Sequence, residues 1–599
     1  MFEQRDCPPV QKKPARAETR AKGGGVWKLC VSLQRMMILN QIHSDILRRP
    51  ERRMWVSTMV VALYLLIGVV FGFDVCDTGQ YLTMYANIFV APESVGYHFM
   101  YYLSGVAGGA FLSLCPDMGV LGIRLLGLLC MVVCMFAVWR MLKPYISPGA
   151  IIAGNALTMV AFAAMPVAFC YDILSIMLYL LAIEQLLKHR ISRVMAGGFL
   201  LGMNVFSRIP NVLGLVFVFI PLLMAWCGAY SKKRALHLSV FSLIGAFLGI
   251  AMVLALMALL GHLSIFAESL ASVYQVASDS SGESSHSLHS LIYQQFRFYK
   301  IGFFTWLKLG TVVAVYTVMR RRITSAPVRF VMLCCALGVS GWMMWRMKPL
   351  TPIWVLCAMG CLTAIVTLRG KVRGVSVVAL MLMLIFPMGS DGVANNGSII
   401  LFLATPVAIA MCVEHTRMFR SDYFILAFAL ICVAKTAVEG VYFDGGALWH
   451  KTARVDSPKA RGILTTEKRA AILNDALCGI RGWVAEGDTL LVYGGMPMLN
   501  YLTSTRPAIH CCWPELLSSE QLRQQLSEMR TSPMVLRQKF VTMGSEFSVP
   551  TPRMLHTYGN AKSNFCIDTK IAVLNHFLAS RHYQIVWENA HFVLYRPGI

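Results

Sequence analysis

Two acidic residues close to the end of the first long apolar run are the first candidates for chemistry. Residues 73–81 read Phe-Asp-Val-Cys-Asp-Thr-Gly-Gln-Tyr and contain Asp74 and Asp77. If a helix begins at Asp77, helical spacing places Gln80 and Tyr81 on the same face as its carboxylate. A carboxylate beside a membrane is costly and usually functional, and it can take a proton from an attacking hydroxyl group. The alternative is that these acids only cap the helix that follows.

A third acid and a basic residue interrupt later apolar stretches. Asp172 follows the apolar run 149–170 and is expected on the same outer side of the membrane as Asp77. It too could be no more than a helix cap. Arg208 precedes Pro210, which suits the first turn of a new helix. A broken helix pair with an arginine at the break is a plausible anion site.

Further basic and aromatic residues are expected to face the same outer cavity. The predicted substrate-binding residues are Gln80, Tyr81, Arg208, His286, His289, Tyr293, Arg297, Arg346 and Lys348. A positively lined cavity beside two acids suits a phosphate-bearing substrate, although each arginine could equally anchor a lipid headgroup. The histidines lie in a Ser-rich stretch, 278–290, whose simpler interpretation is a mobile surface segment. Two acids in one cavity could hold Mg²⁺ or Mn²⁺, but no ligand cluster demands a metal.

The composition shows what must position these residues. The 599-residue chain is 57% hydrophobic and 14% charged, with a mean hydropathy of +0.60, far more apolar than soluble proteins. This excludes a soluble enzyme and predicts a polytopic α-helical membrane protein. The thirteen predicted spans are 54–73, 119–141, 149–170, 173–187, 195–207, 210–228, 235–260, 301–319, 327–345, 350–368, 374–388, 398–413 and 421–440.

The net charge of +24 becomes a topology signal when it is sorted by position. With thirteen spans, the basic clusters fall in cytoplasmic loops, whereas the outer loop 74–118 contains no Lys or Arg. The apolar segment 97–114 is therefore expected to lie in the outer interface, because one more span would invert every later loop. This predicts a multi-pass protein of a bacterial inner membrane with a cytoplasmic N-terminus. No nucleic-acid partner is needed to explain the charge.

Three regions follow from these patterns. Residues 1–53 are predicted to be a basic, largely disordered cytoplasmic segment, and 54–440 the transmembrane domain. Residues 441–599 are less apolar and are predicted to form a periplasmic α/β domain with a helix from Glu467, a strand at 489–493 and a hairpin at 583–595. Cysteines of this outer part could form a disulfide, but the sequence does not give its pairing.

The order of these features resembles the GT-C membrane glycosyltransferases, in particular the protein O-mannosyltransferases and the lipid A aminoarabinose transferases. The sequence Asp-Thr-Gly-Gln-Tyr-Leu at 77–82, with the aromatic loop that follows it, also resembles membrane proteins of Bacteroidetes-type bacteria. The resemblance implies an inverting transferase with a polyprenyl-phosphate sugar donor and a glycan, lipid or protein acceptor. It implies Asp77 as the catalytic acid of the family and Asp172 as a second acid. Many relatives have a second acid directly beside the first, whereas Thr78 follows here, which leaves Asp74 as a competing base.

Two other functions remain open at this level. A transporter or flippase of lipid-linked glycans would also need many spans, polar residues within the membrane and a cationic cavity. A non-catalytic partner in glycan assembly would use the outer domain for binding, and its acids would be structural. The long outer loop with its unneutralised acids favours chemistry at the membrane face.

Overall fold

The computed structural model describes residues 49–162, 167–229, 231–278, 287–347, 350–390, 401–412, 421–441, 443–539 and 567–598. Contacts divide the chain into two compact units, Met1–Trp55 and Val56–Ile599. Of the first unit, the structure describes only residues 49–55, which include the start of helix α2 (Pro50–Val70). The second unit contains the rest of α2 and every other helix and strand of the described residues.

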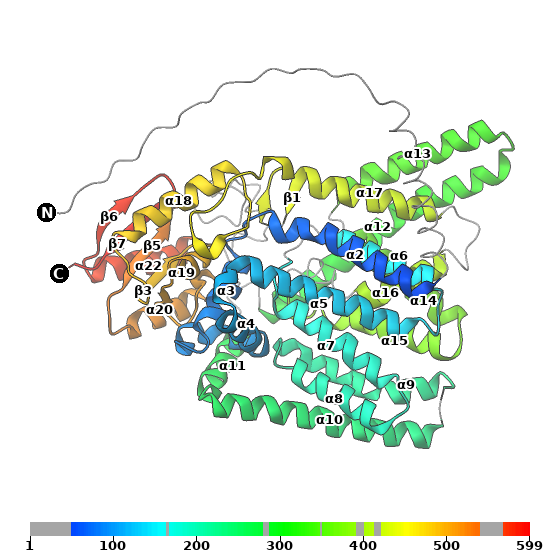
Figure 1. Ribbon diagram of the computed structural model, residues 1–599, viewed down its shortest axis with the longest axis horizontal. Helices are drawn as coiled ribbons and strands as arrows, with labels where there is room; N and C mark the ends of the chain where they lie inside the picture. The colour runs from blue at the N-terminus through cyan, green and yellow to red at the C-terminus, as the bar shows by residue number, and fades with distance from the viewer. Residues whose placement is uncertain are drawn as a thin grey trace, which may run out of the picture. The chain divides into compact units, whose positions relative to one another are not determined.

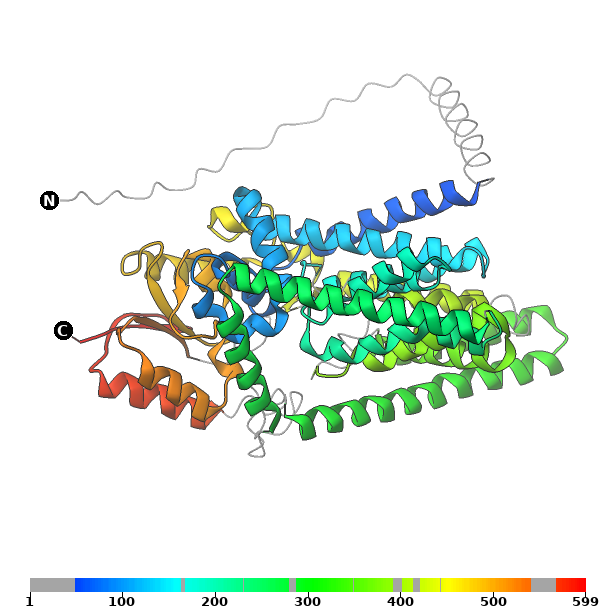
Figure 2. The ribbon, with the colours of Figure 1, turned by 90° about the horizontal axis from the view of Figure 1, so that it is seen from below.

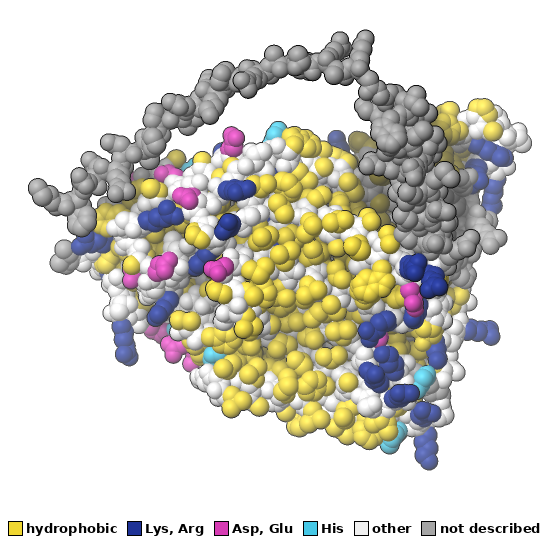
Figure 3. All heavy atoms as spheres, viewed as in Figure 1, with side chains coloured by type: hydrophobic (Ala, Val, Ile, Leu, Met, Phe, Trp, Pro, Cys, Tyr) yellow, Lys and Arg dark blue, Asp and Glu magenta, His cyan; other side chains and the backbone are white. Residues whose placement is uncertain are grey.

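The second unit is mostly helical. Among the described residues, seven helices are long and apolar enough to cross a membrane. They are α2, the run of η2 (Pro116–Met118) and α5 (Gly119–Leu142), the run of η3 (Ile209–Phe219) and α9 (Ile220–Trp226), α10 (Lys232–Leu259), α12 (Leu288–Arg322), α13 (Ala326–Trp345) and α14 (Leu350–Thr367). The protein is therefore a multi-pass helical membrane protein. On the face shown in Figure 3, hydrophobic side chains cover the middle of these helices, and Lys and Arg gather at the end away from the sheet.

Further helices accompany these seven. They are α6 (Pro148–Phe162), α7 (Tyr171–Leu186), α8 (Ile191–Asn204), α11 (Leu263–Ser278), α15 (Gly370–Ile385), α16 (Leu401–Ala410) and α17 (Ser421–Glu439). A helix or helical run overlaps each of the thirteen ranges expected from the sequence. Several of these helices are shorter than the ~20 residues that a span needs, so thirteen crossings remain a prediction.

Close helix packing positions the break that follows α8. Glycines at four-residue spacing face each other on α8 and α10, so that the two backbones touch. A Cβ atom on Gly202 would lie 2.0 Å from the carbonyl oxygen of Ala246, and one on Gly245 would lie 2.0 Å from that of Met195. Any side chain there would push the helices apart. The pair thus fixes the level at which α8 ends and Arg208 follows.

The loop between the first two predicted spans is folded. It contains α3 (Asp77–Asn87), η1 (Pro92–Tyr101) and α4 (Tyr102–Leu114). A Cβ on Gly108 of α4 would lie 2.5 Å from the Tyr85 ring of α3, so this glycine lets the two helices pack closely. At 13 residues, α4 is about 20 Å long, shorter than the ~30 Å hydrocarbon core. Its position in the outer interface stays a prediction.

A mixed five-stranded sheet follows the last long helix. Its strands are β3 (Thr489–Tyr493), β4 (Arg506–Pro507), β5 (Met534–Gln538), β6 (Gln584–Glu588) and β7 (Phe592–Arg596), in the order β4-β3-β5-β7-β6. β3 is parallel to β4 and β5, and β7 is antiparallel to β5 and β6. Its helices are α18 (Glu467–Arg481), α19 (Met498–Leu502), α20 (Ser519–Glu528) and α22 (Ile567–Ser580).

In two perpendicular views, the sheet and its helices lie at one end of the long helices (Figures 1 and 2). The predicted helix from Glu467, the strand at 489–493 and the hairpin at 583–595 all have counterparts here. Because contacts group the sheet with the helices in one compact unit, a domain boundary at residue 440 remains a prediction.

Candidate active site

Asp74 caps the helix that begins at Asp77. The backbone N–H of Cys76 donates to Asp74 Oδ1 at 2.8 Å, and that of Thr78 donates to Oδ2 at 2.7 Å. These bonds satisfy amide groups that the first turn of α3 leaves unpaired. Burial nevertheless raises the pKa of Asp74, which is 2% exposed. Because both oxygens are used by the backbone, a role for Asp74 as the base stays a prediction that this geometry does not favour.

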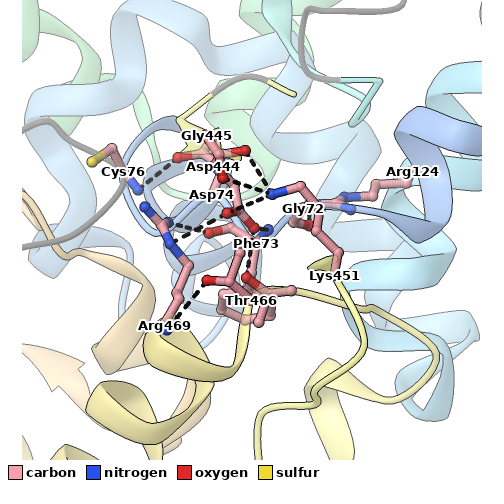
Figure 4. A network of polar contacts seen from close by, with 11 residues as sticks. Gly72, Phe73, Asp74, Cys76, Arg124, Asp444, Gly445, Lys451, Thr466 and Arg469 are labelled. Atoms are coloured by element: carbon pink, nitrogen blue, oxygen red, sulfur yellow. Dashed lines mark hydrogen bonds and ion pairs between the residues drawn. The ribbon is translucent and has the colours of Figure 1, made fainter. Parts of the chain in front are cut away.

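Asp444, a buried acid 371 residues after Phe73 in the chain, holds the turn before α3. Asp444 follows the short strand β1 (Gly440–Val441) and opens β2 (Asp444–Gly445). Asp444 Oδ2 accepts the N–H of Phe73 and the hydroxyl of Thr465, both at 2.6 Å, and Oδ1 accepts Lys451 Nζ at 2.8 Å. Arg469 Nε lies 3.6 Å from the same Oδ1. Figure 4 shows this network, which joins the end of α2 to the region before α18.

Two arginines bind the carbonyl groups at the end of α2. Arg124 of α5 donates to the carbonyl oxygens of Val69 at 3.1 Å and Gly72 at 2.8 Å. Arg469 donates to that of Phe73 at 2.6 Å. The sequence carried a signal for Arg124, because it is a charge inside a predicted span. Together these contacts give α3 and Asp77 a fixed starting point (Figure 4).

The rings of Tyr81, Tyr101 and Tyr171 form a group of aromatic contacts. Tyr81, one turn after Asp77, meets Tyr171 edge-on at 5.6 Å between ring centroids, and Tyr101 stacks on Tyr171 at 3.9 Å with 7° between planes. Burial raises the pKa of Tyr81 well above its usual value, and Tyr171, Asp77 and Asp172 raise it further. Both carboxylates therefore lie within electrostatic reach of the Tyr81 phenol. We call Asp77, Tyr81, Tyr101, Tyr171 and Asp172 the acid–tyrosine cluster.

Arg208 is paired with the second acid of this cluster. Its Nη1 lies 3.6 Å from Asp172 Oδ1, and the two side chains are nearly fully buried. Arg208 also donates to the carbonyl oxygens of Phe386 at 2.8 Å and Met388 at 3.0 Å, just beyond α15. The predicted break between helices is present, because α8 ends at Asn204 and η3 begins at Ile209. The guanidinium is thus largely occupied by protein groups.

Gln80, three residues after Asp77 on α3, contacts a histidine of the same outer segment. Its Nε2 lies 3.0 Å from Nδ1 of His98, whose Nε2 lies 3.1 Å from the thiol of Cys512. Burial lowers the pKa of His98 to about 3, so this imidazole is neutral. Gln80 therefore points to the C-terminal sheet region and links it to α3. It is buried by these groups rather than turned toward the acid–tyrosine cluster.

The other predicted substrate contacts are not gathered at the cluster. His289, Tyr293 and Arg297 are exposed on α12, and Arg346 is exposed and stacks over Trp342 at 5.1 Å. No contact among the described residues joins these side chains to the acid–tyrosine cluster. His286 and Lys348 lie outside the described residues.

The described part of the chain contains no group of three or more His, Cys, Asp or Glu residues that could hold a metal ion. The outer cysteines that it includes are free thiols, namely Cys76, Cys115, Cys478, Cys511 and Cys512. The remaining outer cysteine, Cys566, lies outside the described residues.

No family model matches the chain, and no curated protein matches it either. Among solved structures it is similar to ArnT from Cupriavidus metallidurans in the apo state, at 13% sequence identity and a TM-score of 0.36. That match covers 90% of this chain and 97% of the other. A likeness this distant carries no weight for the architecture or for the function of the site. None of the comparisons supports the resemblance to proteins of Bacteroidetes-type bacteria.

Proposed function

We propose that this protein is an integral membrane glycosyltransferase of GT-C type. It moves a sugar from a polyprenyl-phosphate-linked donor to a glycan, lipid or protein acceptor, with inversion, at the outer face of a bacterial inner membrane. In this orientation the N-terminus is cytoplasmic and the C-terminal sheet is periplasmic. The observation that carries the proposal is the contact group of the Tyr81, Tyr101 and Tyr171 rings, with Asp77 one turn before Tyr81 on α3 and Asp172 directly after Tyr171 on α7.

The proposed reaction uses Asp77 as general base. The acceptor oxygen attacks the anomeric carbon, Asp77 takes the acceptor proton, and the bond from that carbon to the lipid phosphate breaks with its electron pair on the phosphate. Asp77 suits this role because it is only partly buried, whereas Asp74 is enclosed by backbone donors. A base must reach its substrate, and of the two acids only Asp77 is accessible.

Asp172 and the aromatic rings would bind and orient the sugar. In this proposal a sugar hydroxyl group donates to Asp172, whose Oδ1 is buried and accepts no hydrogen bond among the described residues. Its ion pair with Arg208 holds the side chain in place. Flat tyrosine faces provide apolar surface against which a sugar ring can pack. Arg208 is the proposed source of positive charge near the leaving phosphate, although its pair with Asp172 offsets part of that charge. The scheme includes no metal.

The test compares Asp77→Asn with Asp117→Asn, a matched change of an exposed acid in the same outer segment. Full-length protein is assayed with a polyprenyl-phosphate sugar pool for transfer of labelled sugar. We expect Asp77→Asn to lower transfer by about two orders of magnitude or more and Asp117→Asn to leave it unchanged. Normal transfer by Asp77→Asn would overturn the mechanism, and movement of labelled lipid-linked glycan without cleavage would identify a transporter instead.

A further inference from the structure

The carboxyl ends of β3 and β5 form a topological switch point in the C-terminal sheet, that is, a place where the chain connections leave neighbouring strands in opposite directions. β3 lies between β4 and β5 and is parallel to both. After β3 the chain passes through α19 to β4 on one side, whereas the strands that follow β5 lie on the other side. In open α/β sheets, ligands bind outside the carboxyl ends of the strands at such a point. The residues there are Gly494 and Gly495 after β3 and Gln538 at the end of β5.

Glu515 brings a buried carboxylate to this point from η8 (Pro514–Leu516). The residue is 5% exposed, and within the described residues neither carboxylate oxygen accepts a hydrogen bond. Burial raises the pKa of Glu515 to about 7, although its own N–H, the charge of Lys570 and the N–H of Gly494 act in the opposite direction. Lys570 Nζ donates to the main-chain oxygen of Glu515 at 2.8 Å. The N–H groups of Glu515 and Gly494 are therefore close to the carboxylate, but neither of its oxygens accepts a hydrogen bond of normal geometry among the described residues.

Gln538 brings a buried amide to the same glycines. Its Oε1 accepts the N–H of Gly495 at 3.2 Å, whereas its Nε2 donates to no group of the described chain. The side chain is only 3% exposed. A Cβ atom on Gly494 would lie 2.6 Å from Gln538 Cβ, so this glycine allows the two strand ends to approach. Gln538 Nε2 and the Glu515 carboxylate thus both lie beside Gly494 and Gly495.

These two unpaired groups are complementary to each other. The carboxylate needs a donor and the amide nitrogen needs an acceptor, so direct contact would satisfy both. The structure keeps them from pairing, and both remain buried at a cost. A hydroxyl group can accept from Gln538 Nε2 and donate to Glu515 at once, whereas an ammonium group satisfies only the acid and a phosphate only the amide. We propose that Glu515 and Gln538 bind hydroxyl groups of a sugar.

The proposed sugar site adjoins the start of α3. The thiol of Cys76 donates to the carbonyl oxygen of Gly495 at 2.9 Å, and the N–H of Met498 donates to that of Val75 at 3.2 Å. Burial raises the pKa of Cys76, and carboxylates from both sides, including Asp77 and Glu515, raise it further. A sugar at Glu515 would therefore lie in the neighbourhood of the proposed base. Its role as a subsite for substrate rests on the proposed function, whereas sugar binding itself does not.

Binding is tested with free monosaccharides and the full-length protein in detergent. Saturation-transfer NMR with a panel of glucose, mannose, galactose, arabinose and N-acetylglucosamine measures contact and affinity without any transfer reaction. Glu515→Gln replaces the acceptor by an amide, and Gln538→Glu keeps the acceptor for Gly495 while removing the free donor. Each is expected to weaken binding of the best sugar about tenfold. Glu528→Gln, an exposed acid on α20, is the matched control and should bind as the unaltered protein does.

The outcomes separate this site from the proposed reaction. Absence of sugar binding in the unaltered protein, or equal affinity in all variants, would overturn the sugar site. Tighter binding of methylammonium than of any sugar would also overturn it, in favour of a cation site. Sugar binding lost in Glu515→Gln but retained in Asp77→Asn supports the site even if transfer does not depend on Asp77. If Glu515→Gln does not fold, the Gln538→Glu result decides alone.

Discussion

Asp172 and Arg208 form a buried ion pair, with 3.6 Å between Asp172 Oδ1 and Arg208 Nη1. Arg208 also binds two carbonyl groups beyond α15. The second acid of the acid–tyrosine cluster is therefore held by an arginine that comes from a break between two helices and that is itself fixed by a third. Under the proposed function, the positions of substrate groups near Asp172 depend on these contacts.

We expect Arg208→Leu to destabilise the protein by about 3–5 kcal/mol, because it leaves the buried Asp172 carboxylate without its counter-ion and two carbonyl groups without their donor. Thermal unfolding in detergent measures the change. Arg346→Leu removes an exposed arginine that stacks on Trp342 and should alter stability far less. Equal effects of the two substitutions would contradict a structural role for the Asp172–Arg208 pair.

The Asp444 network makes a second stability prediction. Asp444→Asn keeps the shape of the side chain but leaves Lys451 and Arg469 buried beside a neutral amide. We expect a loss of about 3–5 kcal/mol, together with lower transfer activity because the start of α3 is no longer held. The exposed Asp456, paired with Arg481 at 3.7 Å, provides the control. Unfolding that is the same for Asp444→Asn and Asp456→Asn would show that the network is dispensable.

The helices were predictable because apolar runs report directly on burial in lipid, and a helix overlaps every predicted range. That Asp77 and Asp172 lie on a common outer side remains a prediction from the sequence. The contacts of Asp444 and Arg469 could not be expected, because these residues reach Phe73 across several hundred residues of chain. The partners of Gln80 could not be predicted for a similar reason, since His98 lies in the same loop but is held by Cys512 of the C-terminal region. Local periodicity gives the face of a helix, and only long-range packing shows what covers that face.

The stacked tyrosines give a prediction about substrate binding. Tyr171→Leu removes the ring that Tyr101 stacks on and that Tyr81 meets edge-on. Under the proposed function, we expect KM for the donor or acceptor to rise about tenfold, with a smaller change in kcat because Asp77 is untouched. Tyr171→Phe keeps the ring and should behave as the unaltered protein. A fall in kcat alone, shared by both variants, would instead point to a role for the Tyr171 hydroxyl group in the reaction.

Glu515 predicts how stability changes with pH when no sugar is present. Its pKa rises from 4.5 in the unfolded chain to about 7 in the folded protein because the carboxyl group is buried. Between these values the folded state binds more protons, so this group makes stability fall as pH rises from about 4.5 to about 7. The loss at pH 8 is of the order of 3 kcal/mol, from ~1.4 kcal/mol per pKa unit.

Glu515→Gln removes the ionisable group and should abolish this part of the pH dependence. We expect the variant to be more stable than the unaltered protein at pH 8 and similar to it at pH 5, as measured by thermal unfolding across that range. Saturating sugar should reduce the difference at pH 8, because a hydroxyl donor stabilises the ionised carboxylate. A difference in stability that stays constant from pH 5 to pH 8 would show that Glu515 does not titrate there.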